Sequence, residues 1–160
     1  TVAGVSGFQV HIGREISTIS DKCDLLVAMN PASLKANIQW VMLGGTIIID
    51  SDTFVEKAFE KAGYTTNPLE DGTLSSFNII RAPITSLAKQ IALDKGLDFK
   101  VAERTKNMYA LGMVAFIFDR DLDILSKQIE LKFKKNPVIA EVNIEVLKSR
   151  YIYAESIESV

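Results

Sequence analysis

The chain has 160 residues, of which 48% are hydrophobic and 24% are charged, a balance that suits a domain with its own core and excludes a disordered chain. The net charge is −2 and no run of lysine and arginine stands out, so we expect no nucleic-acid partner. The single cysteine excludes an internal disulfide and a multi-cysteine metal site, and no apolar run is long enough to span a bilayer, so we expect a cytoplasmic protein.

The first residues do not supply the usual start of a doubly wound domain. Residues 8–12 alternate apolar and polar side chains, which predicts a half-exposed strand, and residues 13–22 form a polar connection. A doubly wound domain usually opens with a strand and a Gly-rich turn, and the sequence shows neither before residue 8. It also lacks an initiator methionine, so we expect a piece of a longer chain, trimmed at its front.

Residues 24–50 form the segment around which the rest of the chain is organised. Residues 24–29 are almost wholly apolar, as in a strand covered on both faces, and Asn30-Pro31 is a favoured helix start. We expect the helix to end at Gly44-Gly45 and a second buried strand to occupy residues 46–49. The apolar stripe of this helix is expected at Leu34, Ile38 and Val41. Two strands joined by a helix lie parallel, so the predicted fold class is α/β with a mainly parallel sheet and flanking helices.

The next segment continues the alternation of helix and strand. Thr53 and Glu56 have the spacing of a capping box, which predicts a helix that ends at Gly63. Its expected buried face consists of Phe54, Val55, Ala58, Phe59 and Ala62. Residues 77–80 are predicted to form a strand, and Thr85 or Ser86 is expected to cap a helix that continues through Ala92 and is ended by Gly96.

The last third of the chain is predicted to be helical throughout. Thr105 is expected to cap a helix over residues 106–118, and residues 108–118 of it carry no charge on any face. We therefore expect this helix to be buried all round, either under other helices or in a subunit interface, with Gly112 allowing close packing. Two more helices are expected, one starting at Asp119 or Asp121 and one at Asn136-Pro137 that runs toward Tyr151.

Few residues are candidates for chemistry. Asn30 follows a strand at the edge where open α/β sheets bind ligands, but a helix cap is the favoured interpretation. Asp50 and Ser51 share that edge, where an acid can hold a ribose. The G-x-G-x-x-G turn that accompanies such an acid is missing, so a capping role is again favoured.

His11 has no evident partner and is expected to be a surface residue, Cys23 a structural thiol and Trp40 a packing residue. Asn107 could hydrogen-bond across an interface or assist the helix cap. We name no catalytic residue and no metal ligand.

Three segments together resemble a known family. Residues 24–31 and 44–50 read DLLVAMNP and GGTIIID, residues 106–112 read KNMYALG, and residues 4–12 read GVSGFQVHI. Taken in their order along the chain, these segments resemble the gamma-type domain of 2-oxoacid:ferredoxin oxidoreductases. The sequences of the central and helical segments are most similar to those of the alpha subunits of 2-oxoglutarate oxidoreductases, in which a gamma domain is fused to the chain.

The resemblance implies a Rossmann-like fold and a role within a large complex. Such complexes oxidatively decarboxylate a 2-oxoacid, such as 2-oxoglutarate or pyruvate, to an acyl-CoA. They use thiamine diphosphate with Mg²⁺, iron–sulfur clusters and CoA, and they reduce ferredoxin. Thiamine diphosphate and the clusters lie on other domains or subunits, so we expect this chain to hold no resident cofactor, to be inactive alone, and to serve assembly, with CoA as a candidate contact.

The resemblance also assigns domains and candidate sites. Residues 1–150 are expected to form the gamma-type domain, and residues 151–160 an exit segment or linker. Asn30 is carried over as a candidate cofactor contact, and Asn107, Met108 and Gly112 as assembly positions. The family's N-terminal strand and Gly-rich turn are absent. The family also has an arginine followed by paired glycines, and this chain has Val2 in place of the arginine and Ala3 in place of one of the glycines. The rival interpretations are a nucleotide- or NAD-dependent dehydrogenase domain and a non-enzymatic assembly module.

Overall fold

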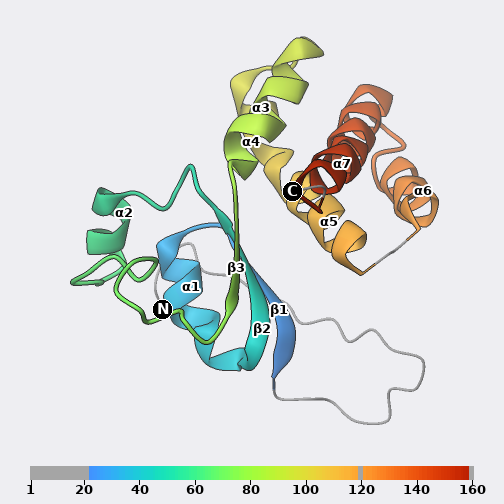
Figure 1. Cartoon of the computed structure of the whole chain (residues 1–160). Coiled ribbons are helices and arrows are strands. Elements are labelled where there is room, and N and C mark those ends of the chain that lie inside the picture. The colour runs from blue at the N-terminus through green and yellow to red at the C-terminus, as the bar shows by residue number, and fades with distance from the viewer. Residues whose placement is uncertain (1–21, 119–120, 159–160) are drawn as a thin grey trace. The chain divides into compact units, whose positions relative to one another are not determined.

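The structure, a computed structural model, describes residues 22–118 and 121–158 (Figure 1). These residues divide between two compact units, the first ending at Pro83 and the second beginning at Ile84. A parallel sheet with helices makes up the first unit, and the second contains only helices among its described residues. The predicted α/β, Rossmann-like fold with a helical C-terminal third is confirmed.

The first unit is built on a three-stranded parallel sheet in the order β1-β2-β3. Its elements are β1 (Cys23–Ala28), α1 (Pro31–Asn37), a short 3₁₀ helix (Ile38–Trp40), β2 (Val41–Asp50), α2 (Glu56–Lys61) and β3 (Asn78–Ala82). The middle strand carries the core, because Ile47, Ile48 and Ile49 are all fully buried. β-Branched side chains of this kind fit a pleated surface that is covered on both faces.

Helix α2 contributes aromatic rings to this core. Phe59 packs edge-on against Phe54 with ring centroids 5.9 Å apart, and against Tyr64 with centroids 6.0 Å apart. Such edge-to-face pairs are favoured by the charge distribution of the rings. Val55, which was expected on the buried face, is exposed instead, because α2 begins only after it and its side chain lies outside the helical stripe. Gly63 ends the helix at a positive φ of 74°, as predicted.

The predicted extent of the first helix is wrong. Helix α1 ends at Asn37, and β2 already begins at Val41, so Gly44-Gly45 lies within a strand and not at a helix end. Cys23 pairs with Val41 and Leu25 pairs with Thr46, so two steps along β1 correspond to five along β2. The extra residues form a bulge in which Gly44 has a φ of 79°. A glycine that permits positive φ serves a helix end and a strand bulge equally well, which explains the error.

The second unit consists of five helices within its described residues. They are α3 (Ile84–Asp94), α4 (Phe99–Arg104), α5 (Lys106–Ile117), α6 (Leu122–Lys132) and α7 (Pro137–Glu158). Helix α5 packs against α7 and α3, and α6 packs against α7. Its neighbours cover much of the uncharged helix, but burial on all sides, as predicted, is wrong, because Ile117 and Phe118 at its end are exposed. Its buried residues are Tyr109, Ala110, Gly112, Met113 and Ala115.

Several predicted helix starts were wrong while others are confirmed. Helix α3 begins at Ile84, so neither Thr85 nor Ser86 precedes it as a cap. Thr105 precedes α5, but its buried hydroxyl donates to the Ala102 carbonyl at 2.6 Å because the unpredicted helix α4 ends there. Asp121 caps α6 as predicted, accepting from the Asp123 N–H at 2.8 Å.

Pro137 opens α7 as expected, but α7 continues to Glu158, beyond the predicted end near Tyr151. The domain boundary after residue 150 stays a prediction, and α7 crosses it without a break. The strand expected at residues 8–12 lies outside the described residues. Among the helices of the described residues, none combines the length and the apolar character that a membrane crossing requires.

Candidate functional site

The carboxyl ends of the three parallel strands meet at one edge of the sheet. Ala28 of β1 is paired with Ile49 of β2, and Asp50 of β2 is paired with Ala82 of β3. The residues that follow each strand therefore come together, including Asn30 after β1 and residues 51–53 after β2. This is the edge at which open α/β sheets bind ligands, and it is the candidate site.

Asn30 acts as a helix cap at this edge. Its backbone is extended, and its Oδ1 atom accepts a hydrogen bond from the Ser33 N–H at 2.8 Å. Pro31 occupies the start of the helix, where a backbone N–H would have no partner within the helix, so its missing N–H costs no hydrogen bond. The predicted cap is confirmed. The cap occupies the Oδ1 atom, whereas the Nδ2 atom is a separate donor, so a ligand contact by Asn30 stays a prediction.

Asp50 is a fully buried carboxylate at the end of β2. Its Oδ1 atom accepts from the Asp52 N–H at 3.3 Å, and its carbonyl accepts from the Thr53 N–H at 3.0 Å. These bonds fold the chain into a tight turn directly after the strand. A side chain with no exposed surface cannot reach a ribose at the edge, so the dinucleotide-binding interpretation finds no support here. Asp50 stabilises the turn and does not cap a helix.

Thr53 links the ends of two strands. Its Oγ1 atom lies 2.7 Å from the Met29 carbonyl oxygen and donates to it across the edge from β2 to β1. The predicted capping box of Thr53 and Glu56 is therefore wrong, because the hydroxyl is used by Met29 and α2 begins only at Glu56, with no side-chain cap. Sequence reasoning missed this role, since the partner atom is a backbone carbonyl 24 residues away.

The third strand is tied to the same edge. The Ser51 N–H donates to the Ala82 carbonyl at 2.9 Å, which extends the β2–β3 ladder past the strand end. Together with the bond from Thr53 to Met29, this contact joins all three strand ends. The candidate edge is thus held by backbone and hydroxyl contacts, and its geometry is fixed before any ligand arrives.

The predicted assembly residues lie in the second unit, at the start of α5. Met108 is half-buried and Gly112 is buried one turn later, so the two share a face of the helix. Asn107 is exposed on a neighbouring face. The structure therefore brings Met108 and Gly112 together and leaves Asn107 accessible. Their role in assembly stays a prediction.

The other candidates have ordinary environments. Cys23 is a free, half-buried thiol at the start of β1, and burial raises its pKa, so the neutral thiol form is favoured. That environment agrees with the expected structural thiol. Trp40 was expected to serve in packing, but it is 49% exposed, so neighbouring residues cover only about half of it. His11 lies outside the described residues.

No group of three or more potential metal ligands occurs among residues 22–118 and 121–158. The edge offers a capping amide, a hydroxyl and a buried carboxylate, all used in holding the fold. The described site can position chain segments or contact a ligand.

Comparisons with known proteins identify relatives across both units. The family model described as pyruvate ferredoxin/flavodoxin oxidoreductase matches residues 2–153. The 2-oxoglutarate oxidoreductase subunit KorA of Mycobacterium tuberculosis (strain ATCC 25618 / H37Rv) is 42% identical over 160 residues, which is 99% of this chain and 24% of that protein. The chain therefore spans about a quarter of the length of this curated relative.

Proposed function

The chain belongs to the pyruvate ferredoxin/flavodoxin oxidoreductase family, and we propose that it is the gamma-type domain of a complex that oxidatively decarboxylates a 2-oxoacid to an acyl-CoA. The observation that carries this proposal is the 42% identity to a 2-oxoglutarate oxidoreductase subunit over almost the whole chain. The same relative favours 2-oxoglutarate as the substrate of the complex. The electrons would pass to ferredoxin, and we place the complex in the cytoplasm.

The redox chemistry of such a complex belongs to its other parts. Iron–sulfur clusters need several cysteine thiolates, and this chain has a single cysteine, so its residues do not fit a cluster. Mg²⁺, which accompanies thiamine diphosphate, is held by carboxylate and other oxygen ligands, and the described residues hold no cluster of acidic ligands. Other domains or subunits would therefore carry thiamine diphosphate, Mg²⁺ and the clusters. This chain alone would be inactive.

Two contributions remain for this chain. The first is assembly through the start of α5, where Asn107 is exposed beside the half-buried Met108. The second is contact with CoA at the sheet edge, where the amide of Asn30 is the candidate group. The rigid joining of the three strand ends supports a positioning role for this edge. Neither contribution requires the chain to make or break a bond.

The experiment is to purify the native complex through a tag on this chain. We expect other polypeptides, iron and thiamine diphosphate to be present in the preparation, and CoA-dependent reduction of a viologen dye when a 2-oxoacid is added. A stable multi-subunit preparation with iron and no 2-oxoacid-dependent reduction would favour the non-enzymatic assembly module. A lone chain without either cofactor that binds NAD would favour the dehydrogenase domain and overturn the proposal.

A further inference from the structure

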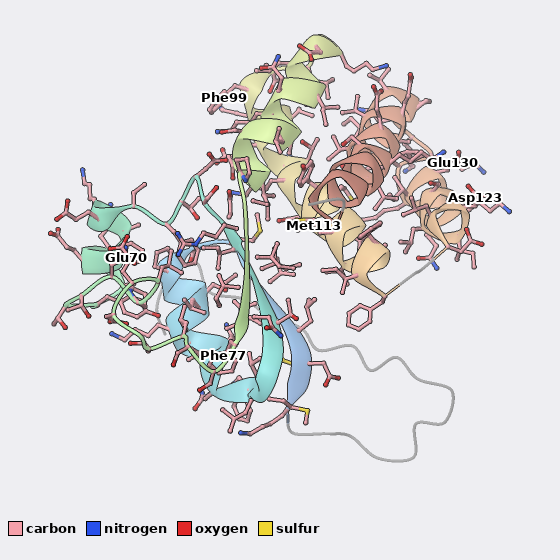
Figure 2. The ribbon with its side chains drawn as sticks, in the orientation of Figure 1. Glu70, Phe77, Phe99, Met113, Asp123 and Glu130 are labelled. Carbon is pink, nitrogen blue, oxygen red and sulfur yellow. The ribbon has the colours of Figure 1, made fainter. Side chains whose placement is uncertain are left out.

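The loop that joins α2 to β3 contains the dipeptide Asp71-Gly72 in a turn. Both residues are exposed, and Gly72 has a φ of 84°. Figure 2 labels Glu70, which directly precedes this turn, and Phe77, which leads into β3. Asp71 is the only aspartate or asparagine of the chain that is followed by glycine. This dipeptide is chemically sensitive, because glycine has no side chain to shield its backbone nitrogen from the neighbouring carboxyl group.

The reaction available at this dipeptide is closure of a five-membered succinimide ring. The Gly72 nitrogen attacks the side-chain carboxyl carbon of Asp71, and the hydroxyl of the protonated carboxyl leaves with the nitrogen's proton as water. Water then adds to the ring and breaks one of its two carbonyl–nitrogen bonds. Cleavage at the side-chain carbonyl restores aspartate. Cleavage at the backbone carbonyl leaves isoaspartate, in which the main chain runs through the side chain, and no oxidant or second reactant is consumed.

The turn holds the Asp71 carboxylate through both of its oxygens. The Thr66 hydroxyl donates to Oδ2 at 2.6 Å, and the Thr73 N–H donates to Oδ1 at 2.9 Å. Such donors favour the ionised carboxylate, and they lower the pKa of Asp71, with the bond from Thr66 as the largest cause. An ionised carboxyl group resists attack by a nitrogen nucleophile, so both hydrogen bonds oppose ring closure.

The turn is also anchored to the first unit on both sides. Pro68 is buried before it, and Leu74 is buried after it in the hydrophobic core. The Ser76 carbonyl then accepts a hydrogen bond from the Gly44 N–H at 2.8 Å, which ties the end of the loop to the bulge of β2. Isoaspartate adds one methylene to the main chain between these anchors. The modification would therefore displace the core contacts that flank the turn.

We propose that Asp71-Gly72 is the site at which this chain isomerises spontaneously to isoaspartate, and that the Thr66 hydroxyl restrains the reaction in the folded state. The dipeptide supplies the reactivity, and the two hydrogen bonds supply the restraint. Asp50-Ser51 is the internal reference, because serine is small but the Asp50 side chain is fully buried. Neither the site nor the restraint depends on the proposed reaction with a 2-oxoacid.

The first experiment measures where isoaspartate forms. The native complex purified through this chain is incubated at neutral pH, digested, and assayed for isoaspartate with an isoaspartate-specific methyltransferase and mass spectrometry. Isoaspartate should accumulate at Asp71 and stay lower at Asp50. In urea, Asp71 should isomerise at least about fivefold faster, because unfolding removes the hydrogen bonds. Absence of isoaspartate at Asp71 in urea would overturn the site, and equal rates with and without urea would overturn the restraint.

The second experiment isolates the Thr66 hydroxyl. Thr66→Val should raise the rate at Asp71 in the folded complex by at least about threefold, because the donor to Oδ2 is lost. Thr66→Ser keeps a hydroxyl and should keep the wild-type rate. The matched control is Thr65→Val, which removes a neighbouring exposed hydroxyl and should leave the rate unchanged. A wild-type rate in Thr66→Val, or an equal increase in Thr65→Val, would overturn the role of Thr66.

The third experiment removes the reactive glycine. Gly72→Asn keeps a residue that tolerates positive φ and places a side chain beside the attacking nitrogen. Isoaspartate at Asp71 should fall to the level found at Asp50. The isoaspartate form of the wild-type chain, separated by chromatography, should melt at a lower temperature than the unmodified form, because the core contacts of Leu74 are displaced. Undiminished isoaspartate at Asp71 in Gly72→Asn would overturn ring closure at this dipeptide, and an unchanged melting temperature would overturn its coupling to the core.

Discussion

Two adjacent glycines in β2 are required for different reasons. Gly44 has a φ of +79°, and a Cβ atom on it would meet no heavy atom within 4 Å. A Cβ atom on Gly45 would instead lie 2.8 Å from the Met42 carbonyl oxygen and 3.0 Å from the Asp24 carbonyl oxygen. At Gly44 the positive φ therefore limits which residues can replace glycine. At Gly45 the close approach of neighbouring backbone atoms limits the replacement.

We expect substitutions to separate these two causes. Gly44→Asn should cost less than about 1 kcal/mol of unfolding free energy, because Asn tolerates the left-handed region. Gly45→Asn should cost about 1–3 kcal/mol or more, because its Cβ atom forces the backbone of the bulge apart. Urea denaturation of the two variants measures both costs. Equal costs would contradict the close approach at Gly45.

Asn30 allows the cap to be separated from a ligand contact. Asn30→Ala should lower the unfolding free energy by about 1 kcal/mol, because the bond from the Ser33 N–H is lost. Asn30→Asp keeps the acceptor oxygen and should keep the stability, but it removes the Nδ2 donor. Unfolding and CoA-dependent turnover of the complex are measured for both. Unchanged turnover in Asn30→Asp would mean that the residue is a cap alone.

The turn around Asp71 predicts a dependence of stability on pH. A hydrogen bond from the Thr66 hydroxyl, 2.6 Å from Oδ2, and bonds from Thr73 lower the pKa of Asp71 below its ordinary value of 3.8. Because the folded pKa lies below the unfolded one, the stabilisation is present above the unfolded pKa and is lost as the pH falls through the folded pKa.

We therefore expect Thr66→Val to be less stable than wild type near neutral pH and equally stable in strong acid. The neighbouring Thr65→Val is the control and should show no such convergence. Thermal unfolding across the acidic range gives the stability difference, and NMR titration of Asp71 gives its pKa. A stability difference that stays constant with pH would contradict the role of this hydrogen bond.

At the scale of elements, the packing of α5 can be tested at its buried glycine. Gly112 is buried in the helix that packs against α7 and α3. Gly112→Leu should destabilise the chain by about 1–3 kcal/mol and reduce the yield of the complex, because bulk is added to a filled interior. Gly112→Ala is the matched control, since it adds only a methyl group and improves helix propensity. Wild-type stability and yield in Gly112→Leu would contradict this packing.

Elements that depend on local chemistry were predictable from the sequence. The Asn30-Pro31 start, the buried isoleucine strand and the Asp121 cap each rest on neighbours within four residues, and all three are confirmed. Elements that depend on distant contacts were not predictable. Thr53 bonds to Met29 instead of capping its own helix, and the β2 bulge at Gly44-Gly45 is defined by pairing with β1.

The candidate site was predictable in position but not in detail. A parallel sheet fixes which strand ends meet, so the edge containing Asn30 and Asp50 followed from the alternation of strands and helix. The burial of Asp50 and the bond from Thr53 to Met29 depend on the tertiary fold. The assembly roles of Asn107, Met108 and Gly112 stay predictions from family resemblance, because their residue types are also those of an ordinary packed helix.

At the scale of the whole molecule, the role that we propose for this chain is that of a scaffold in a reaction carried out by other domains. It has one cysteine and no cluster of metal ligands among its described residues. Its match covers about a quarter of a 2-oxoglutarate oxidoreductase subunit. The contributions proposed for this chain are assembly and a contact with CoA.

The most direct test of this account is the rate of viologen reduction by the native complex purified through this chain. We predict reduction that requires both CoA and a 2-oxoacid, with 2-oxoglutarate faster than pyruvate. The 160-residue chain alone should show no rate under the same conditions. An intact complex that contains iron and thiamine diphosphate yet reduces no dye with any 2-oxoacid would contradict the account.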